Sequence, residues 1–401
     1  MNRPPIRDGG VLIRGASIID VGPADALERS NGTAEILDLG EVVLTPGLVN
    51  AHAHLELSDA TPPEQAGTFV DWLLAVIRSR VSLGEGILQA AATAALAGAA
   101  ESVRHGVTCV GDISRFPGAT RPALVTSPLR VISFGEIQAM AGRRHLLDER
   151  LGIATSMAAE GWDGPGRLLV AISPHAPYSV EPEGYRRCLA WSQAHGRPLT
   201  THLAETPQEA TFLAGHGGDF RELWDALGDW RDDVPRFGGG PIRLAAELGL
   251  LTHPTLLAHV NYIDDDELAL LARGQASVVW CPRTHAYFGH PPHRFREMLA
   301  RGVRVCLGTD SRASSPDLNL LDDLRLVRRQ HADLPPQALW DLVTRNAAEA
   351  LGVADRLGTL AAGRWADLAS WPLPDAGDPL LALLDHGVSP RQVWIAGEVV
   401  A

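Results

Sequence analysis

The chain has 401 residues, of which 45% are hydrophobic and 21% charged, and its formal net charge is −13. This length and composition predict a soluble globular protein with one large domain and a small accessory one. The negative charge argues against a surface for nucleic acid or an anionic membrane, and no apolar run is long enough for a transmembrane helix.

The cysteines and the absence of lysine limit the kinds of site that this chain can form. The four cysteines are far apart and show no CxxC spacing, and the first residues lack the apolar core of a signal peptide, so we expect free thiols and a cytoplasmic location. All 35 basic residues are arginine. A Schiff-base lysine and a carbamylated-lysine metal bridge are therefore excluded, because arginine stays protonated and cannot replace lysine in either role.

Strand-like segments occur at both ends of the chain. Residues 11–19 and 34–44 read as short strands, and residues 366–371 and 393–400 look like their partners. Strands at the two ends can pair when the domain between them brings the termini together. The sequence therefore predicts a small β-sandwich made of residues 1–45 and 360–401, attached to a large domain of residues 46–359.

The large domain shows eight apolar, strand-like runs separated by helical segments. The runs are residues 44–52, 107–112, 130–136, 168–173, 199–203, 255–259, 276–281 and 303–309. The main helical segments are residues 86–104, 184–195, 264–273, 294–301, 317–330 and 334–351. Strands alternating with helices indicate a parallel sheet, and eight such units predict an α/β fold of the (β/α)8 barrel type. Residues 206–250 are expected to form an elaborated loop over the barrel mouth.

Polar residues close several of these runs. His52 and His54 are two positions apart at a strand end, so they face the same side and form a natural pair of metal ligands. Later strand ends carry His202 with Glu205, then His259, then Asp310. Because catalytic groups of such barrels lie at the carboxyl ends of the strands, these side chains should converge on one mouth.

The motifs PGLVNAHAHLE, THLAE, LAH and LGTDS, in this order, resemble the amidohydrolase superfamily and most closely its deaminase and chlorohydrolase branch. The resemblance covers nearly the whole chain. It implies that four residues bind one divalent metal ion, zinc by preference or iron: His52, His54, His202 and Asp310. Three imidazoles and one carboxylate leave a position open for a reactive water, as expected of a catalytic site. A second metal is not expected, although Glu136 is a conceivable bridge.

The same resemblance implies a hydrolytic deaminase. A water whose pKa is lowered by the metal attacks a ring carbon that bears an amino group. Asp310 and His259 accept or orient the proton of that water. Glu205 donates a proton to the adjacent ring nitrogen and later passes one to the departing ammonia.

Five further residues are candidate substrate contacts: Glu56, Glu136, His175, Arg283 and His285. Glu56 either binds a ribose hydroxyl or is an exposed loop residue. Arg283 and His285, with His290, either recognise an anionic or hydroxyl-rich end of the substrate or belong to a turn made rigid by proline and glycine.

The motifs HLELS and CPRTHAYFGHPP are most similar to aminodeoxyfutalosine deaminases, which act on an adenine-bearing intermediate of menaquinone biosynthesis. Alternatives within the branch are deaminases of S-adenosylhomocysteine or methylthioadenosine, of guanine or of cytosine, and triazine chlorohydrolases. An alternative of another class is a non-catalytic barrel that only binds a metal or ligand. The expected partner is a small-molecule substrate, and the resemblance suggests a homodimer.

Overall fold

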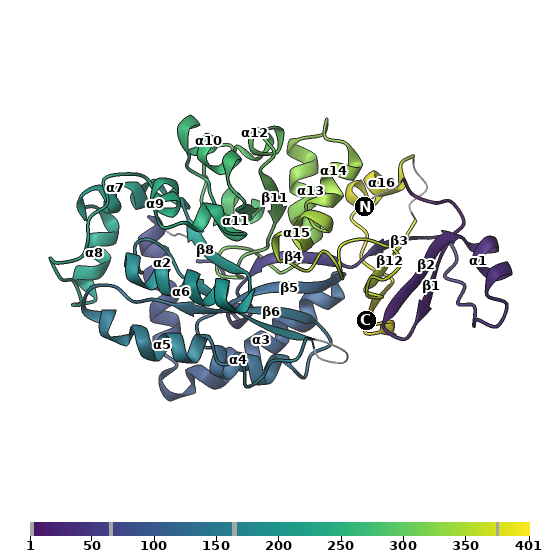
Figure 1. The fold of residues 1–401 in the computed structure, drawn as a ribbon, viewed down its shortest axis with the longest axis horizontal. Helices are drawn as coiled ribbons and strands as arrows, with labels where there is room; N and C mark the ends of the chain where they lie inside the picture. The colour runs from purple at the N-terminus through teal and green to yellow at the C-terminus, as the bar shows by residue number, and fades with distance from the viewer. Residues whose placement is uncertain (1–3, 64–66, 163–166, 374–376) are drawn as a thin grey trace.

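The computed structural model of the chain describes residues 4–63, 67–162, 167–373 and 377–401. Its largest sheet has eight parallel strands that follow one another in chain order around a barrel (Figure 1). They are β4 (Leu48–Ala53), β5 (Val107–Ser114), β6 (Arg130–Ile137), β7 (Leu168–Pro174), β8 (Leu199–Leu203), β9 (Thr255–His259), β10 (Ser277–Trp280) and β11 (Arg304–Leu307). The predicted barrel is confirmed.

The barrel closes between its first and last strands. Ala53 forms a parallel bridge with Asp310, and the Asp310 N–H donates to the His52 carbonyl oxygen at 3.1 Å. A Cβ atom at Gly308 would lie 2.7 Å from that same oxygen, so the close approach of β11 to β4 requires glycine there. Closure therefore brings the ends of the first and last strands together.

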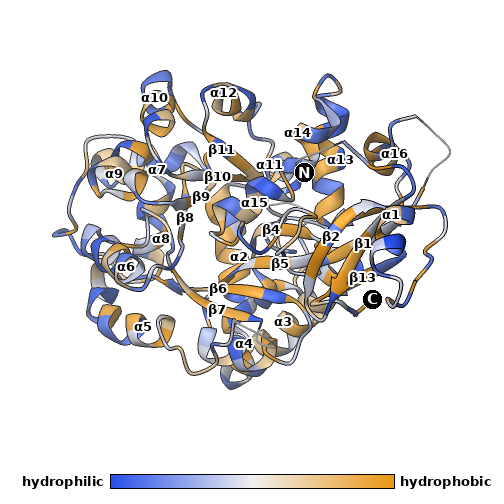
Figure 2. Ribbon diagram, turned by 45° about the vertical axis from the view of Figure 1, so that its right-hand side comes forward, coloured by the Kyte–Doolittle hydropathy of each residue, from blue (hydrophilic) through white to orange (hydrophobic). Residues whose placement is uncertain are grey.

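Alternate strand residues pack on opposite sides of the barrel wall. Cys109 and Ile132 belong to one buried cluster, whereas Val110 and Val131 belong to another that includes residues of the surrounding helices. Figure 2 shows the hydrophobic strands enclosed by helices whose outer faces are hydrophilic. Because both faces are covered, the strands are continuously apolar, and the sequence reveals them clearly.

Helices connect the strands and extend over the carboxyl ends. They are α2 (Phe69–Val81), α3 (Ile87–Arg104), α4 (Pro117–Leu124), α5 (Leu147–Ala154), α6 (Pro182–His195), α7 (Pro207–Gly215), α8 (Asp219–Ala226), α9 (Pro241–Glu247), α10 (Asp265–Arg273), α11 (Pro282–Tyr287), α12 (Phe295–Ala300), α13 (Leu320–Gln330), α14 (Pro336–Asp341) and α15 (Arg345–Ala350). Side chains from α2, α7, α8 and several strand-end loops form one apolar cluster, which we call the cap. The cap contains Phe69, Tyr178, Phe220 and Trp224. Among the described helices, none is long and apolar enough to cross a membrane.

The two ends of the chain build an accessory unit. β3 (Val42–Pro46), β12 (Leu368–Pro372), β13 (Gln392–Ile395) and β14 (Glu398–Val399) form an antiparallel sheet, and β1 (Gly9–Arg14) pairs with β2 (Ser17–Pro23). Short helices α1 (Ala24–Ser30) and α16 (Pro379–Asp385) accompany them. Ile18 and Trp394 share a small buried cluster between hairpin and sheet. The sequence predicted a small β-sandwich from both termini, and the structure confirms that the two ends of the chain join in β structure, as an antiparallel sheet with a separate hairpin. The division of the chain at residues 45 and 360 stays a prediction.

Three local predictions differ from the structure. Residues 11–19 do not form one strand, because the chain turns at Gly15, whose φ is +56°. Residues 34–41 lie outside the strands and expose Ile36 and Leu37, so their apolar character does not reflect burial. The run 44–52 is divided at Gly47 between the terminal sheet and the barrel.

Candidate active site

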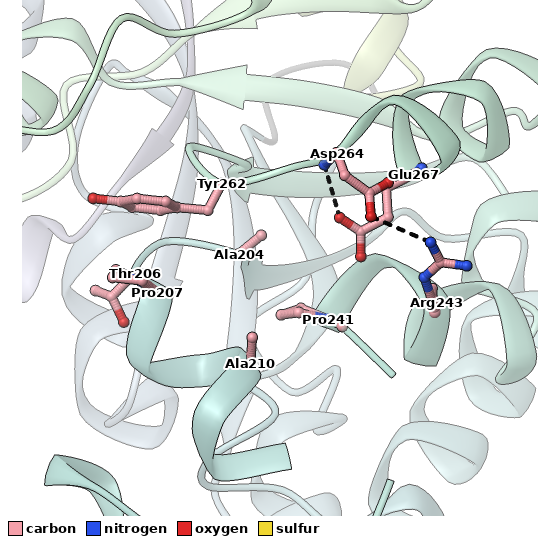
Figure 3. A pocket seen from close by; sticks show the side chains of 10 residues that line it. Ala204, Thr206, Pro207, Ala210, Pro241, Arg243, Tyr262, Asp264 and Glu267 are labelled. Atoms are coloured by element: carbon pink, nitrogen blue, oxygen red, sulfur yellow. Dashed lines mark hydrogen bonds and ion pairs between the residues drawn. The ribbon is translucent and has the colours of Figure 1, made fainter. Parts of the chain in front are cut away.

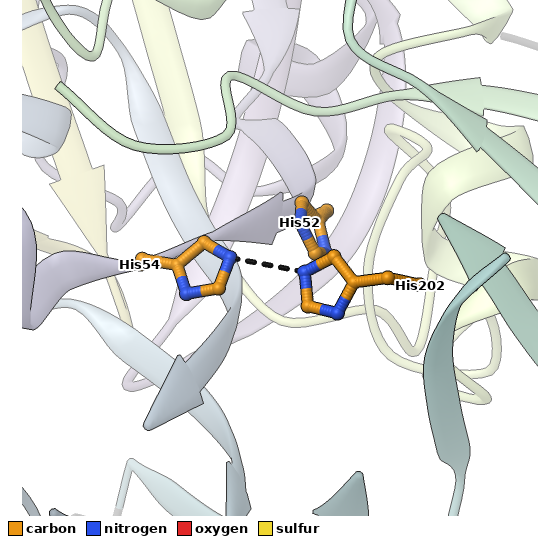
Figure 4. Close-up of side chains that lie close together, drawn as sticks. All are labelled: His52, His54 and His202. Carbon is orange, nitrogen blue, oxygen red and sulfur yellow. Dashed lines mark hydrogen bonds between the residues drawn. The ribbon is translucent and has the colours of Figure 1, made fainter. Parts of the chain in front are cut away.

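Three histidines converge at the carboxyl end of the barrel (Figure 4). His52 lies in β4, His54 directly follows it, and His202 lies in β8. The Nε2 atoms of His54 and His202 are 3.2 Å apart. Two ligand atoms of a tetrahedral metal site with bonds of 2.0–2.1 Å are separated by about 3.4 Å, so this spacing fits two imidazoles that share one ion.

Buried polar atoms without a hydrogen-bond partner also indicate a metal site. Both ring nitrogens of the buried His52 lack a hydrogen-bond partner among the described residues. The Asp310 Oδ1 atom lies 3.7 Å from His52 Nε2 and 3.5 Å from His54 Nε2. Because buried polar groups normally have partners, a missing ligand is the simplest explanation. These four residues could therefore hold a divalent metal ion.

The protonation states suit metal binding. Burial lowers the pKa of His54 to about 4 and lowers the pKa of His202 well below its usual range. Both imidazoles are therefore neutral near pH 7, which is the form that binds metals.

Glu205, His259 and Asp310 form a second buried group, with ligand atoms within 4.8 Å of one another. The Glu205 Oε1 atom is 3.5 Å from His259 Nε2. Burial raises the pKa of Glu205 well above its usual range, and the charges of Asp310 and Glu209 add to the rise. Burial lowers the pKa of His259 to about 3. The group thus pairs a protonated carboxyl, able to donate, with a neutral imidazole, able to accept.

Three residues at or near the strand ends of the site have an unusual backbone conformation. Ala204, His259 and Asp310 have φ values of +51°, +74° and +57°, in a region that residues other than glycine seldom adopt. All three lie at or just beyond strand ends of the barrel. Such conformations persist only where surrounding contacts hold them, and they concentrate at functional sites.

Glu209 and His293, for which the sequence predicted no role, make hydrogen bonds to the backbone of two of these segments. The carboxylate of Glu209 accepts the N–H groups of Ala204, Glu205 and Thr206 at 2.9, 2.6 and 3.2 Å. His293 Nε2 donates to the His259 carbonyl oxygen at 2.9 Å. Glu209 was detectable, because Thr206-x-x-Glu209 is a capping box at the start of α7. No sequence pattern marks His293.

Glu136 and His175 lie beside the histidine cluster. Glu136 Oε1 is 3.8 Å from His175 Nε2, and the ligand atoms of both lie within 4.8 Å of a ring nitrogen of His202. The His175 carbonyl oxygen accepts from His202 Nδ1 at 3.0 Å, which orients Nε2 of His202 toward the cluster. Their contact with substrate stays a prediction, and their position is compatible with it.

The other three predicted substrate contacts have partners within the protein. Glu56 is 5% exposed and accepts from Ser114 Oγ and the Arg115 and Phe116 N–H groups, so the alternative of an exposed loop residue is wrong. Arg283 forms ion pairs, and His285 Nε2 lies 2.9 Å from the Pro291 carbonyl oxygen. Substrate contact by these residues stays a prediction that their observed contacts do not support.

A separate pocket of about 200 Å³ lies next to this site (Figure 3). Ala204 and Thr206, the neighbours of Glu205, contribute to its wall, and an Arg243–Asp264 hydrogen bond of 3.2 Å closes one side. None of the candidate metal ligands lines the pocket. We therefore place the chemistry at the histidine cluster.

Comparisons with known proteins agree with the motifs at the strand ends. The model of the amidohydrolase family matches residues 43–400. A 5-methylthioadenosine/S-adenosylhomocysteine deaminase from Moorella thermoacetica is 30% identical over 376 residues, covering 91% of this chain and 81% of the relative.

Two solved structures share the fold. The Helicobacter pylori aminofutalosine deaminase in complex with methylthio-coformycin has a TM-score of 0.85 at 22% identity, covering 98% of this chain and 95% of that chain. An adenosine deaminase from Xanthomonas campestris with bound zinc has a TM-score of 0.81 at 22% identity, covering 98% and 88%. At these identities the likeness concerns the fold alone.

Proposed function

Because the chain belongs to the amidohydrolase family and is thus a hydrolase acting on carbon–nitrogen bonds, we propose that it deaminates an adenine-type nucleoside. One observation carries the proposal. A buried carboxyl that favours the protonated state, Glu205, lies 3.5 Å from His259 and three residues beyond the candidate ligand His202. This arrangement suits protonation of a ring nitrogen next to an amino-bearing carbon.

The candidate ligands are His52, His54, His202 and Asp310, and we propose zinc as the ion that they hold. Neutral imidazoles and a carboxylate suit zinc or iron, and the Xanthomonas campestris relative contains zinc. The bound ion would supply a Lewis acid and lower the pKa of a water molecule toward about 7.

The protein's own groups then manage the protons. His259, which is neutral, accepts or orients a proton of the attacking water together with the Asp310 carboxylate. Glu205 gives its proton to the ring nitrogen, which prevents negative charge from accumulating there. The resulting carboxylate takes up the proton of the hydroxyl group that has been added to the ring carbon and delivers it to the amino group, which departs as ammonia. The cap and the deep burial of these groups limit the access of bulk water, which strengthens each electrostatic interaction.

For the substrate we propose aminodeoxyfutalosine, an intermediate of menaquinone biosynthesis. The short motifs around Glu56 and His285 and the fold likeness to the Helicobacter pylori aminofutalosine deaminase support it. The names of the more similar relatives favour a second candidate, 5-methylthioadenosine or S-adenosylhomocysteine. Both candidates carry a 6-aminopurine, so the proposed chemistry is the same. A cytoplasmic location and a homodimer stay predictions.

Ammonia release from purified, zinc-loaded protein tests the proposal. The panel contains adenosine, 5-methylthioadenosine, S-adenosylhomocysteine, aminodeoxyfutalosine, guanine and cytosine, and chloride release from a chlorotriazine is measured separately. We expect turnover of the 6-aminopurine nucleosides, and its complete absence would refute the proposal. The Glu205→Gln variant should keep its zinc, measured by elemental analysis, and lose turnover. A barrel that only binds a ligand would have no activity for this substitution to remove.

A further inference from the structure

The candidate metal ligands meet across the seam at which the barrel closes. His52 and His54 lie at the end of the first strand, β4, and Asp310 follows the last strand, β11. In the part of the chain that the structure describes, these two strands form no continuous ladder, and an isolated bridge between Ala53 and Asp310 joins them. Strands β8 and β9, in contrast, pair along their whole length. Backbone pairing alone therefore defines the distance between the two groups of ligands only weakly.

The side chain of Asn50 joins the two strands at this seam. Asn50 lies in β4 and is fully buried. Its Nδ2 atom donates to Thr309 Oγ1 at 2.8 Å, and its Oδ1 atom accepts the Thr309 N–H at 3.2 Å. The same Oδ1 atom accepts the N–H of His52 at 3.3 Å. One amide is thus bonded to a candidate ligand residue of β4 and to the residue that precedes Asp310, an arrangement that we call the Asn50–Thr309 clasp.

The clasp lies next to a residue with an unusual backbone conformation. Asp310 has a φ of +57°, and such a conformation persists only where surrounding contacts hold it. Thr309 is held by the clasp on one side of Asp310, and on the other side Ser314 Oγ donates to Asp310 Oδ2 at 3.0 Å. The second carboxylate oxygen, Oδ1, then faces His52 Nε2 at 3.7 Å and His54 Nε2 at 3.5 Å. The contacts of Asp310 thus direct one oxygen atom toward the histidines.

A buried amide inside β4 requires a physical reason. Residues 48, 49, 51 and 53 of this strand are apolar and buried, and asparagine is depleted in strands. Burial of an amide costs free energy unless hydrogen bonds replace those made to water. The three bonds of Asn50 meet this requirement, but an apolar side chain would be buried without needing partners. What the amide adds is a defined geometry, because a fully bonded polar group specifies the positions of its neighbours more strictly than apolar packing does.

Closure of the barrel does not depend on the clasp alone. Three residues before His52, the N–H of Val49 donates to the Val343 carbonyl oxygen at 2.8 Å. Three residues before Asp310, the N–H of Leu307 donates to the carbonyl oxygen of residue 342 at 3.0 Å. The segment that follows α14 therefore binds both β4 and β11. Loss of the clasp should disturb the ends that carry the ligands and leave the barrel closed.

We propose that Asn50 and Thr309 are positioning residues that set the distance between the histidines of β4 and Asp310, and thereby the affinity and geometry of the metal ion held there. The inference rests on the proposed function, because it takes these residues as ligands of one ion. Ligands that are already held in place lose little freedom when the ion binds. Replacing the groups that orient metal ligands typically lowers metal affinity by about 10- to 100-fold.

Two substitutions of Thr309 test the clasp. Thr309→Val removes the hydroxyl group that accepts from Asn50 and nearly preserves the shape of the side chain, whereas Thr309→Ser keeps the hydroxyl group. Zinc affinity is measured by competition with a chromophoric chelator. We expect Thr309→Val to bind zinc about 10- to 100-fold more weakly than the wild type, and Thr309→Ser to stay within about threefold of it.

Asn50→Leu removes the whole clasp and should weaken zinc binding at least as much as Thr309→Val. Asn346→Leu is the matched control. Asn346, on α15, donates to the Val305 carbonyl oxygen at 2.9 Å, so this substitution also removes an amide bonded across to the last strand, but five residues before Asp310. It should leave the zinc affinity unchanged. Circular dichroism and urea denaturation of the metal-free proteins verify folding, and the Thr309 pair decides the question if Asn50→Leu does not fold.

Cobalt(II) in place of zinc gives a readout that a general loss of stability would not change. The visible absorption bands of cobalt depend on the number and arrangement of its ligands. We expect shifted or weakened bands in Thr309→Val and the wild-type spectrum in Thr309→Ser and Asn346→Leu. An unchanged zinc affinity and cobalt spectrum in Thr309→Val, or equal losses in all three variants, would overturn the clasp. Absence of ammonia release from every 6-aminopurine nucleoside would instead overturn the proposed function, while the metal affinities would still decide the role of the clasp.

Discussion

Replacing Glu209 with glutamine should make the stability of the protein less dependent on pH. Glu209 is 1% exposed, and burial raises the pKa of its carboxyl from 4.5 to about 7, although the three N–H groups of residues 204–206 oppose the shift. Glutamine has nearly the shape of a protonated glutamic acid and carries no charge at any pH. The variant therefore represents the protonated state of this site.

The sign of the effect follows from proton binding. Between pH 4.5 and about 7 the folded protein holds a proton on Glu209 that the unfolded chain has lost. The stabilisation connected with this proton is complete below pH 4.5 and is lost as the pH rises through about 7. A difference of about 2.5 pKa units at 1.36 kcal/mol per unit corresponds to about 3 kcal/mol. This is the upper limit for one fully buried carboxyl.

Urea denaturation of wild type and Glu209→Gln at pH 5, 6, 7 and 8, with saturating zinc, measures the difference directly. We expect nearly equal unfolding free energies at pH 5 and a variant that is more stable by up to about 3 kcal/mol at pH 8. Glu247→Gln, an exposed position on α9, controls for the loss of one negative charge. A difference that stays constant with pH would contradict the reasoning. A variant that becomes less stable as the pH rises would show that the N–H groups outweigh burial.

Three further outcomes are expected. His293→Ala should lower kcat by about 10- to 100-fold, because the carbonyl group of His259 loses its hydrogen-bond donor. His293→Gln should recover most of this loss. Equal losses for the two variants in steady-state kinetics would refute a positioning role for His293. The Arg130 Nε atom lies 2.7 Å from the carboxylate of Asp367, whose side chain is 1% exposed. Arg130→Met would leave this carboxylate buried without its counterion. The substitution should therefore destabilise the fold by about 3–5 kcal/mol in denaturation experiments. Removal of the metal with a chelator should abolish ammonia release by the wild type, and added zinc should restore it. The His52→Ala variant should not regain ammonia release at the same zinc concentration. Activity that survives metal removal would contradict the proposed metal centre.

The barrel was predictable from the sequence because its strands are buried on both faces. A strand between an inner core and a layer of helices must be apolar along its whole length, so β8 and β9 were predicted with their observed bounds. The short terminal strands carry a weaker signal. Residues 34–41 contain apolar side chains that remain exposed, and local composition cannot distinguish them from residues that a sheet covers.

The sequence by itself also determined the chemistry available at the strand ends. A barrel of parallel strands places every carboxyl end at the same rim, which predicts that the polar strand-end residues converge. The choice of His52, His54, His202 and Asp310 as the metal ligands came from the resemblance of the motifs to the amidohydrolases. The structure brings these four side chains together, as this argument requires.

Only the tertiary structure decided which side chains pair with one another. Arg283 is occupied by aspartates 34 and 40 residues away. Glu56 faces the end of β5 instead of solvent, and His293 reaches the carbonyl oxygen of His259 across 34 residues. Pairing of this kind depends on strand register and loop path. These follow from the packing of the whole chain, and no local pattern of residues encodes them.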